Sequence, residues 1–243
     1  PLRWEVVGSY HHDNQAFTQG LEFQDGYLWE STGLTRSSTM RQVEMRSGAV
    51  VKKVHNSNTE FGEGLTRVND TLLQLTWRNK ILIKYAYPSL ERLGYVEFKS
   101  HKNNEGWGIC FDGTRLIVSD GSQYLTFIDP HTLVQTHQLK VCAVTDPRRP
   151  GVNILDINEL ECVEGEVLAN VWHSTNILRI DPDTGTVIGT LDMKTLYPAP
   201  VLANREHCLN GIAYDAAGST DNYRRLYITG KQWDKLFEVL WYP

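Results

Sequence analysis

The sequence predicts an all-β fold, a five-bladed β-propeller, from three observations. Short runs rich in Val, Ile, Leu, Tyr and Trp alternate with turn signals, and helix signals are nearly absent. A short element recurs five times along the chain, in units of roughly 40–50 residues. The last unit ends early while a strand-like segment precedes the first one, as expected of a circular array that closes on itself.

The recurring element is a polar residue, usually followed by Gly and then by an apolar residue. Its copies start 44, 42, 53 and 52 residues apart and are Gln19-Gly20-Leu21, Glu63-Gly64-Leu65, Glu105-Gly106-Trp107, Asn158-Glu159-Leu160 and Asn210-Gly211-Ile212. A second strand is predicted after each copy, at Tyr27–Thr32, Leu72–Trp77, Leu116–Asp120, Val167–Trp172 and Leu226–Lys231. A third strand and usually a fourth follow, as in residues 177–181 and 187–191. Units of about four strands are typical of propeller blades.

The two ends of the chain are expected to share one blade. The fifth unit ends after the apolar run Lys235–Leu240, one strand short of the others. The segment Trp4–Tyr10 precedes the first unit and has no other place in the array. Since an open array would leave exposed sheet edges, we expect this segment to form the outer strand of the last blade. Residues 1–243 are thus predicted to form a single propeller domain.

Composition narrows the classes of partner. The net charge of the 243 residues is -5, and no basic face of the kind that binds nucleic acid is visible. No apolar stretch approaches the roughly 20 residues that span a bilayer, so a membrane partner is not expected either. No signal peptide is recognisable, and we expect that any targeting segment has been removed or trimmed.

The four cysteines form no Cys-x-x-Cys pair. Cys110 and Cys162 lie in apolar strand patterns, where buried free thiols are common. Core packing is therefore the favoured interpretation, and a single disulfide is the alternative.

A polar site is predicted at the mouth of the central channel. The first strand of each blade lines the propeller axis, so the repeated polar residues should face one another there. They are Gln19, Glu63, Glu105, Asn158 (or its neighbour Glu159) and Asn210. The ends of the second strands should add Trp77, Trp172 and Lys231, and Trp107 follows Glu105. A polar residue beside Gly can also be purely architectural, an interpretation favoured for Glu105 and left open for Asn210.

Glu63 is the strongest candidate for proton transfer. Gly62 and Gly64 flank it and permit a close approach of backbone or substrate. If Trp77 and Trp107 cover its carboxylate, desolvation should raise its pKa toward the range useful for acid–base catalysis. For Lys231, simple solvation is the alternative interpretation.

Motifs of other chemistries are absent from the sequence. It contains no Gly-x-Ser-x-Gly elbow, no His-Glu-x-x-His and no phosphate-binding loop. No metal-ligand pattern is visible, so we predict no metal in the site. His173, beside Trp172, could also reach the channel mouth, although a structural role is favoured.

The motifs taken together resemble one known family. They are Phe17-Thr18-Gln19-Gly20-Leu21, Glu63-Gly64-Leu65-Thr66 with Leu75-Thr76-Trp77, Asn104-Glu105-Gly106-Trp107-Gly108, Ile157-Asn158-Glu159-Leu160-Glu161, Ala169-Asn170-Val171-Trp172, Leu209-Asn210-Gly211-Ile212-Ala213 and Ile228-Thr229-Gly230-Lys231. In this order, and over nearly the whole chain, the sequence resembles the plant-type and bacterial glutaminyl cyclases, or glutaminyl-peptide cyclotransferases. The resemblance implies a five-bladed propeller that converts the N-terminal glutamine of peptides and proteins to pyroglutamate and releases ammonia.

The resemblance also implies roles for individual residues. Glu63 matches the family's acid–base glutamate, and Lys231 and Asn158 are expected to act with it in catalysis. The substrate-binding positions implied are Phe17, Gln19, Trp77, Trp107 and Trp172. No cofactor is expected for catalysis, although a structural calcium ion is conceivable. The resemblance further implies a secreted, periplasmic or other exported compartment, and we expect the protein to be a monomer.

Two other functions fit a propeller and serve as rivals. A non-catalytic peptide-docking platform would not need a carboxylate and a lysine facing one pocket. A calcium-dependent propeller hydrolase would need several acidic or amide side chains around a central ion.

Overall fold

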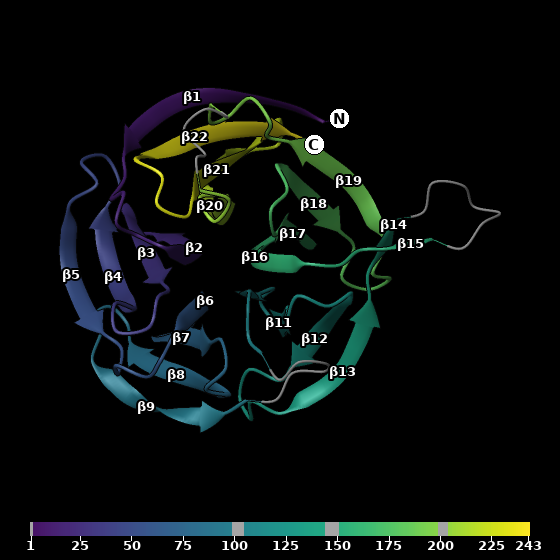
Figure 1. The fold of residues 1–243 in the computed structure, drawn as a ribbon. Helices are drawn as coiled ribbons and strands as arrows, with labels where there is room; N and C mark the ends of the chain where they lie inside the picture. Colours follow the sequence, from purple (N-terminus) through teal and green to yellow (C-terminus); the bar gives the residue numbers. More distant parts are fainter. Residues whose placement is uncertain (1, 99–104, 144–150, 199–203) are drawn as a thin grey trace.

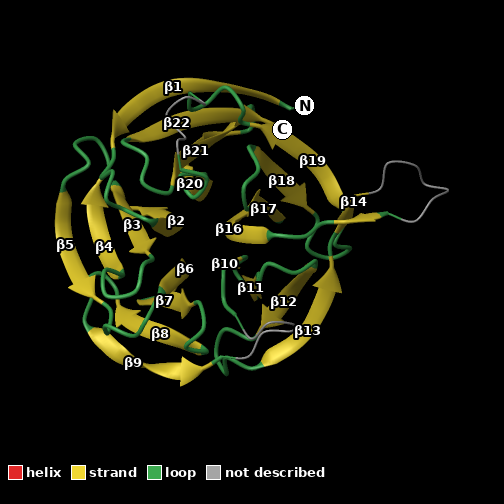
Figure 2. Cartoon of the chain, in the orientation of Figure 1, coloured by secondary structure: helices red, strands yellow, loops and turns green. Residues whose placement is uncertain are grey.

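The computed structural model describes residues 2–98, 105–143, 151–198 and 204–243, so Asn104 of the third motif lies outside the described residues. Five four-stranded antiparallel sheets are arranged around a central axis, which confirms the predicted five-bladed propeller (Figure 1). Figure 2 shows only strands and loops in the described part of the chain. Accordingly, none of the described residues belongs to a helix with the length and apolar character needed to cross a membrane.

The blades follow the sequence in order, each running from the axis outward. Blade 1 contains β2 (Thr18–Gln24), β3 (Tyr27–Thr32), β4 (Thr39–Glu44) and β5 (Val50–His55). Blade 2 contains β6 (Gly62–Val68), β7 (Thr71–Thr76), β8 (Ile81–Ala86) and β9 (Arg92–Glu97). Blade 3 contains β10 (Ile109–Phe111), β11 (Leu116–Val118), β12 (Tyr124–Ile128) and β13 (Gln135–Lys140). Blade 4 contains β16 (Ile157–Val163), β17 (Glu166–Val171), β18 (Asn176–Ile180) and β19 (Val187–Asp192). A two-stranded ribbon that the sequence did not predict, β14 (Cys142–Ala143) with β15 (Val152–Asn153), lies between blades 3 and 4.

Blade 5 is built from both ends of the chain. It contains β20 (Leu209–Thr220), β21 (Tyr223–Gly230) and β22 (Lys235–Tyr242), with β1 (Arg3–His11) as its outer strand. β1 pairs antiparallel with β22, so that Trp4 lies opposite Trp241 and Tyr10 opposite Leu236. The predicted closure by the N-terminal strand is therefore confirmed, and both termini lie side by side in Figure 1.

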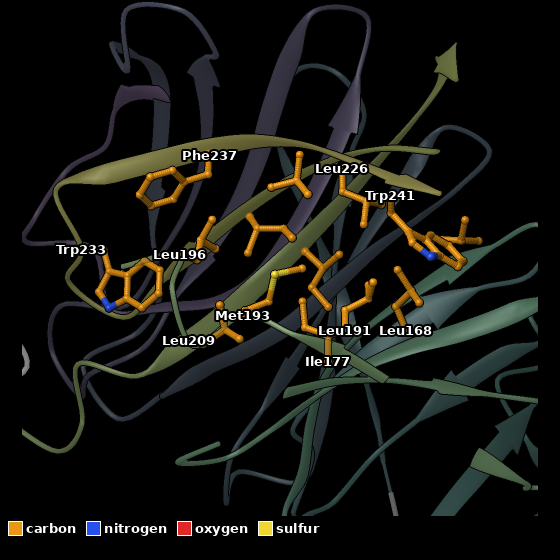
Figure 3. Packing of buried hydrophobic residues seen from close by; sticks show 14 residues of the cluster. Leu168, Ile177, Leu191, Met193, Leu196, Leu209, Leu226, Trp233, Phe237 and Trp241 are labelled. Atoms are coloured by element: carbon orange, nitrogen blue, oxygen red, sulfur yellow. The ribbon is translucent and has the colours of Figure 1, made fainter. Parts of the chain in front are cut away.

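The hydrophobic core is divided into clusters that lie between neighbouring blades. In the cluster between blades 4 and 5, Leu168, Ile177 and Leu191 of one sheet pack against Leu226 and Trp241 of the other (Figure 3). Because each sheet buries both faces against its neighbours, every blade is held by the two beside it.

The pairing register corrects the predicted repeat in blade 3. In four blades, equivalent inner-strand residues pair with the residue nine positions later in the sequence. The pairs are Leu21 with Glu30, Leu65 with Gln74, Ile109 with Val118 and Leu160 with Ala169. Ile109 is thus the equivalent of Leu21. The position of Gln19 and Glu63 is then occupied in blade 3 by Trp107, and the prediction that Glu105 belongs to the ring of repeated polar residues was wrong.

Close packing of the inner strands explains this register. A Cβ atom on Gly64 would lie 2.8 Å from the Gly108 Cα, and one on Gly108 would lie 2.1 Å from the Asn158 carbonyl oxygen. The glycine that blade 3 requires at this point is therefore Gly108 rather than Gly106.

A disulfide joins Cys110 of β10 to Cys162 of β16, with a Cα–Cα distance of 5.4 Å. The favoured interpretation of these two residues as free thiols was therefore wrong, and the alternative holds. The two strands are neighbours at the axis although the cysteines are 52 residues apart in sequence. Cys142 and Cys208 are free.

Candidate active site

A cavity of about 300 Å³ opens at one end of the axial channel. It is lined by Phe17, Gln19, Phe61, Glu63, Trp77, Trp107, Asn158, Trp172, Glu206 and Lys231. All eight predicted site residues are in this set, so the structure brings them together in one place. The volume suits a small ligand or a single side chain with its backbone.

Two structural positions supply most of these side chains. Gln19, Glu63 and Asn158 lie near the starts of inner strands, where neighbouring blades approach most closely. Trp77 and Lys231 directly follow second strands, and their backbone N–H groups donate to the carbonyls of Phe61 (3.0 Å) and Cys208 (2.9 Å). These bonds fix the chain where it turns at the mouth, so the side chains are held by strands rather than by free loops.

The carboxylate of Glu63 is buried in the cavity. The residue is 4% exposed, and among the described residues no side chain or backbone N–H donates to its carboxylate oxygens. Burial raises the pKa of Glu63 well above its usual value, the nearby Lys231 opposes this shift, and the charge of Glu105 adds to it. A carboxyl group with a raised pKa and free acceptor atoms is suited to both accept and donate a proton.

Lys231 is a buried cation on the same cavity. It is 3% exposed, and its Nζ lies 4.9 Å from the centroid of the Phe17 ring. No carboxylate of the described residues forms an ion pair with it within 4.0 Å. The alternative that Lys231 is simply solvated is therefore wrong. A desolvated ammonium group facing a cavity is suited to stabilise negative charge on a ligand.

Aromatic rings form the walls of the cavity. Phe61 contacts Trp77 and Phe17, with ring centroids 5.5 and 6.1 Å apart, and Trp107 contacts Trp172 at 5.7 Å. Such contacts fix the rings and leave a rigid apolar enclosure.

Glu105 anchors two of the tryptophans. Its carboxylate accepts the indole N–H of Trp77 at 2.8 Å and that of Trp107 at 3.0 Å. Arg78 donates to the same carboxylate at 3.2 Å and stacks on the Trp77 ring. Glu105 therefore has the structural role favoured for it, although it holds the cavity wall rather than closing the channel.

The amide side chains of Gln19 and Asn158 complete the polar part of the cavity, and Asn210 contacts Gln19 without lining the cavity itself. Asn210 donates through Nδ2 to the Thr18 carbonyl at 2.9 Å and to Oε1 of Gln19 at 3.3 Å. The NH₂ group of Gln19 is left to donate elsewhere. Oδ1 of Asn158 is buried and has no hydrogen-bond partner among the described residues. A ligand with an N–H group would satisfy it.

Two cavity residues were missed by the sequence analysis. Phe61 has the same place relative to Glu63 as Phe17 has relative to Gln19, so the repeat Phe-x-(Gln/Glu)-Gly-Leu carried a signal for it. Glu206 lies in the connection before β20 and carries no such signal. Its Oε1 lies 3.2 Å from Nε2 of His173, so His173 contacts a cavity residue without lining this cavity itself. Within the described residues, no group of three or more His, Cys, Asp or Glu side chains is arranged to hold a metal ion.

Comparisons with known proteins agree with one another. The sequence model of the family described as Glutamine cyclotransferase matches residues 1–240. The glutaminyl-peptide cyclotransferase of Arabidopsis thaliana is 37% identical over 238 residues, which cover 97% of this chain and 70% of the plant protein. The crystal structure of Myxococcus xanthus glutaminyl cyclase aligns with a TM-score of 0.86 at 35% identity, over 100% of this chain and 98% of the bacterial one.

A more distant structure shares the fold alone. The WD40 β-propeller domain of Doa1 aligns with a TM-score of 0.51 at 12% identity, over 90% of this chain and 62% of that domain. At this level of identity the similarity shows the propeller fold alone.

Proposed function

This chain belongs to the glutamine cyclotransferase family, and from that premise we propose that it converts the N-terminal glutamine of peptides to pyroglutamate by metal-independent acid–base catalysis. It is an enzyme of glutaminyl-peptide cyclisation that acts on peptide substrates. One observation carries the proposed mechanism: the buried Glu63 carboxylate accepts no hydrogen bond from the described residues and shares its cavity with the buried cation Lys231.

Proton transfer is assigned to Glu63. The α-amine nitrogen of the substrate attacks its own γ-carbonyl carbon, a C–N bond forms, and the nitrogen gives a proton to the Glu63 carboxylate. The tetrahedral intermediate then breaks the bond to the amide nitrogen. Glu63 returns the proton to this nitrogen, which leaves as ammonia. The raised pKa of Glu63, caused first by burial, supports both halves of this exchange.

Stabilisation of the negative charge on the γ-oxygen is assigned to Lys231. The carbonyl oxygen becomes negative as the ring closes, and a desolvated ammonium group stabilises that charge most in the transition state. The amide of Asn158 or Gln19, on the same cavity, would supply a hydrogen bond to the same oxygen.

The aromatic walls are assigned to substrate binding. Cyclisation requires the glutamine side chain to fold back on its own amine. A cavity of about 300 Å³ bounded by Phe17, Trp77, Trp107 and Trp172 favours the compact rotamer over the extended one. Restricting the rotamer in this way lowers the entropic part of the barrier.

We further propose that the protein is a monomer in an exported compartment, with no nucleic-acid or membrane partner. The disulfide between Cys110 and Cys162 supports an oxidising compartment, because disulfides are rare in proteins of the reducing cytosol. The net charge of -5 supports the absence of a nucleic-acid partner.

One assay tests the function and its metal independence. Ammonia release is followed with a peptide that begins with glutamine, in the presence and absence of EDTA. We expect equal release in both conditions. No release in either would favour a docking platform, whereas release abolished by EDTA and restored by calcium would favour a calcium-dependent enzyme.

A further inference from the structure

A second cavity of about 340 Å³ lies beside the first and is not used by the proposed reaction. Its lining is mixed: Met193, Tyr197, Leu209 and Trp233 are apolar or aromatic, whereas His173, Thr175, Asn204, Arg205 and His207 are polar or charged. These residues come from the connections that follow β17, β19 and β21 and from the start of β20. The cavity therefore lies over blades 4 and 5, on the Trp172 and Lys231 side of the site.

The two cavities are separated by consecutive residues of the chain. Trp172 lines the first cavity and the adjacent His173 lines the second, with ring centroids 4.1 Å apart. The backbone N–H of Lys231, from the first cavity, donates to the carbonyl of Cys208, from the second, at 2.9 Å. Glu206 of the first cavity contacts His173 at 3.2 Å.

The floor of the second cavity is apolar and rigid. The rings of Tyr197 and Trp233 are stacked, with centroids 4.2 Å apart and an interplanar angle of 10°. Trp233 donates through Nε1 to the His207 carbonyl at 2.9 Å, and the Tyr197 hydroxyl donates to Asp234 at 2.8 Å. Figure 3 shows Trp233 and Met193 within the packed core cluster of blades 4 and 5. A floor held in this way is shaped before any ligand arrives.

Substrate geometry connects the two cavities. The reaction changes only the first residue of a peptide, and the chain beyond it must leave the first cavity. Consecutive Cα atoms are about 3.8 Å apart, so the second residue lies at the rim of the cavity that holds the first. The second cavity, whose lining begins at the residue after Trp172, is therefore next to the place where the second residue leaves the first cavity.

We propose that the second cavity is the subsite for the side chain of the second substrate residue, and that it favours a large apolar or aromatic side chain. This inference rests on the proposed function, because it takes a peptide with N-terminal glutamine as the substrate. The stacked rings offer an aromatic side chain both apolar area and ring contacts. A glycine at the second position would leave this floor uncovered.

The test compares the kcat/KM values of three amidated tripeptides, Gln-Phe-Ala, Gln-Leu-Ala and Gln-Gly-Ala. We expect the wild-type enzyme to prefer the Phe and Leu peptides over the Gly peptide by roughly tenfold, as an apolar pocket usually discriminates. In Thr175→Trp the new side chain should fill the cavity and bring the three values together, by lowering those for the Phe and Leu peptides. Thr175 is exposed, and the N–H of Met193 donates to its backbone carbonyl, a bond that does not depend on the side chain, so the fold should tolerate the change.

Two further variants control the test. Val134→Trp adds the same bulk at a residue of blade 3 that is 62% exposed and should keep the wild-type preference. Tyr197→Ala should reduce the preference for Phe by removing half of the stacked floor, whereas Tyr197→Phe should retain it.

The results of the test distinguish a failure of the proposed function from a failure of the proposed subsite. No ammonia from any of the three peptides would overturn the proposed function. Turnover without a preference in the wild type, or a preference that survives both Thr175→Trp and Tyr197→Ala, would overturn the subsite alone. An equal loss on all three peptides in both variants would also contradict it, because the substitutions would then act on the catalytic cavity.

Discussion

Two stretches of the axial channel contain buried or half-buried carboxylates, and they differ in the hydrogen bonds that those carboxylates accept. At the mouth, the carboxylate of Glu63 accepts no hydrogen bond from the described residues. Farther along the inner strands, each carboxylate accepts a backbone N–H of the neighbouring blade. Glu22 accepts that of Arg67 at 3.2 Å, Glu159 that of Ile212 at 3.1 Å, and Glu161 that of Tyr214 at 2.7 Å.

Burial raises the pKa in both stretches. It is the largest cause of the raised pKa of Glu63, and burial raises the pKa of Glu22 to about 7. A raised pKa alone therefore does not distinguish a catalytic carboxylate from one that joins two blades. What distinguishes Glu63 is the combination of unused acceptor capacity, a cavity for substrate and a cation beside it.

Glu63→Gln gives the strongest test of this comparison. The substitution keeps size and polarity but removes the proton carrier, so kcat should fall by at least ~10²-fold. Because no residue in the described ranges donates a hydrogen bond to this carboxylate, the melting temperature should stay at the wild-type value or rise. Steady-state ammonia release and thermal denaturation measure the two effects. Wild-type turnover by this variant would remove Glu63 from the mechanism.

Lys231→Met tests the cation beside Glu63. Methionine keeps the side-chain stem and deletes the charge, so kcat should fall by about 10²-fold while KM changes little. Removal of the cation also takes away the influence that lowers the pKa of Glu63, so the acid limb of the kcat/KM profile should move to higher pH. A raised KM with an unchanged kcat would instead make Lys231 a ground-state contact.

Glu22→Gln tests the other side of the comparison through stability. In wild type the folded carboxyl has a pKa of about 7, above its unfolded value near 4.5, so the folded state binds more protons between these two pH values. Its contribution to stability is complete below pH 4.5 and is lost as pH rises through about 7. Glutamine does not titrate and stays neutral. Between pH 5 and pH 8, the unfolding free energy of wild type should therefore fall by about 1–3 kcal/mol more than that of the variant.

Urea denaturation across this pH range measures the difference, and ammonia release should stay within about twofold of wild type. A large loss of activity at unchanged stability would give Glu22 a catalytic role and would contradict the distinction drawn between the two stretches of the channel.

The sequence predicted the blades and most of the site because both depend on the repeat. Equivalent positions in five similar units must meet at one axis, which brought Gln19, Glu63 and Asn158 together without any knowledge of the fold's details. The same reasoning extends to Phe61, which repeats the position of Phe17 and was overlooked.

Residues and contacts that do not recur from blade to blade were not predicted from the sequence. Glu206 lies in a connection between blades, and the path of such a connection does not follow from its neighbours in sequence. The register of blade 3 was misassigned because a polar residue was expected at every copy. The close approach of inner strands in fact fixes the register through Gly108 and places Trp107 at that point. The disulfide required knowing that β10 and β16 are adjacent at the axis.

Glu105→Gln is expected to have the smallest effect. It tests whether Glu105, which holds the wall of the cavity, also raises the pKa of Glu63. The charge of Glu105 contributes to the raised pKa of Glu63, so its removal should lower that pKa and shift the acid limb of the kcat/KM profile to lower pH. Glutamine still has one oxygen to accept an indole N–H from Trp77 or Trp107, so kcat at the optimum should fall by no more than about threefold.

Glu91→Gln is the control for this test, because it removes an exposed carboxylate of blade 2 and should leave the pH profile unchanged. A lower kcat with an unmoved acid limb would mean that Glu105 acts only by holding the tryptophans. A shift toward higher pH would contradict the electrostatic account of Glu63 itself, because removing a neighbouring negative charge can only make a carboxyl group easier to ionise.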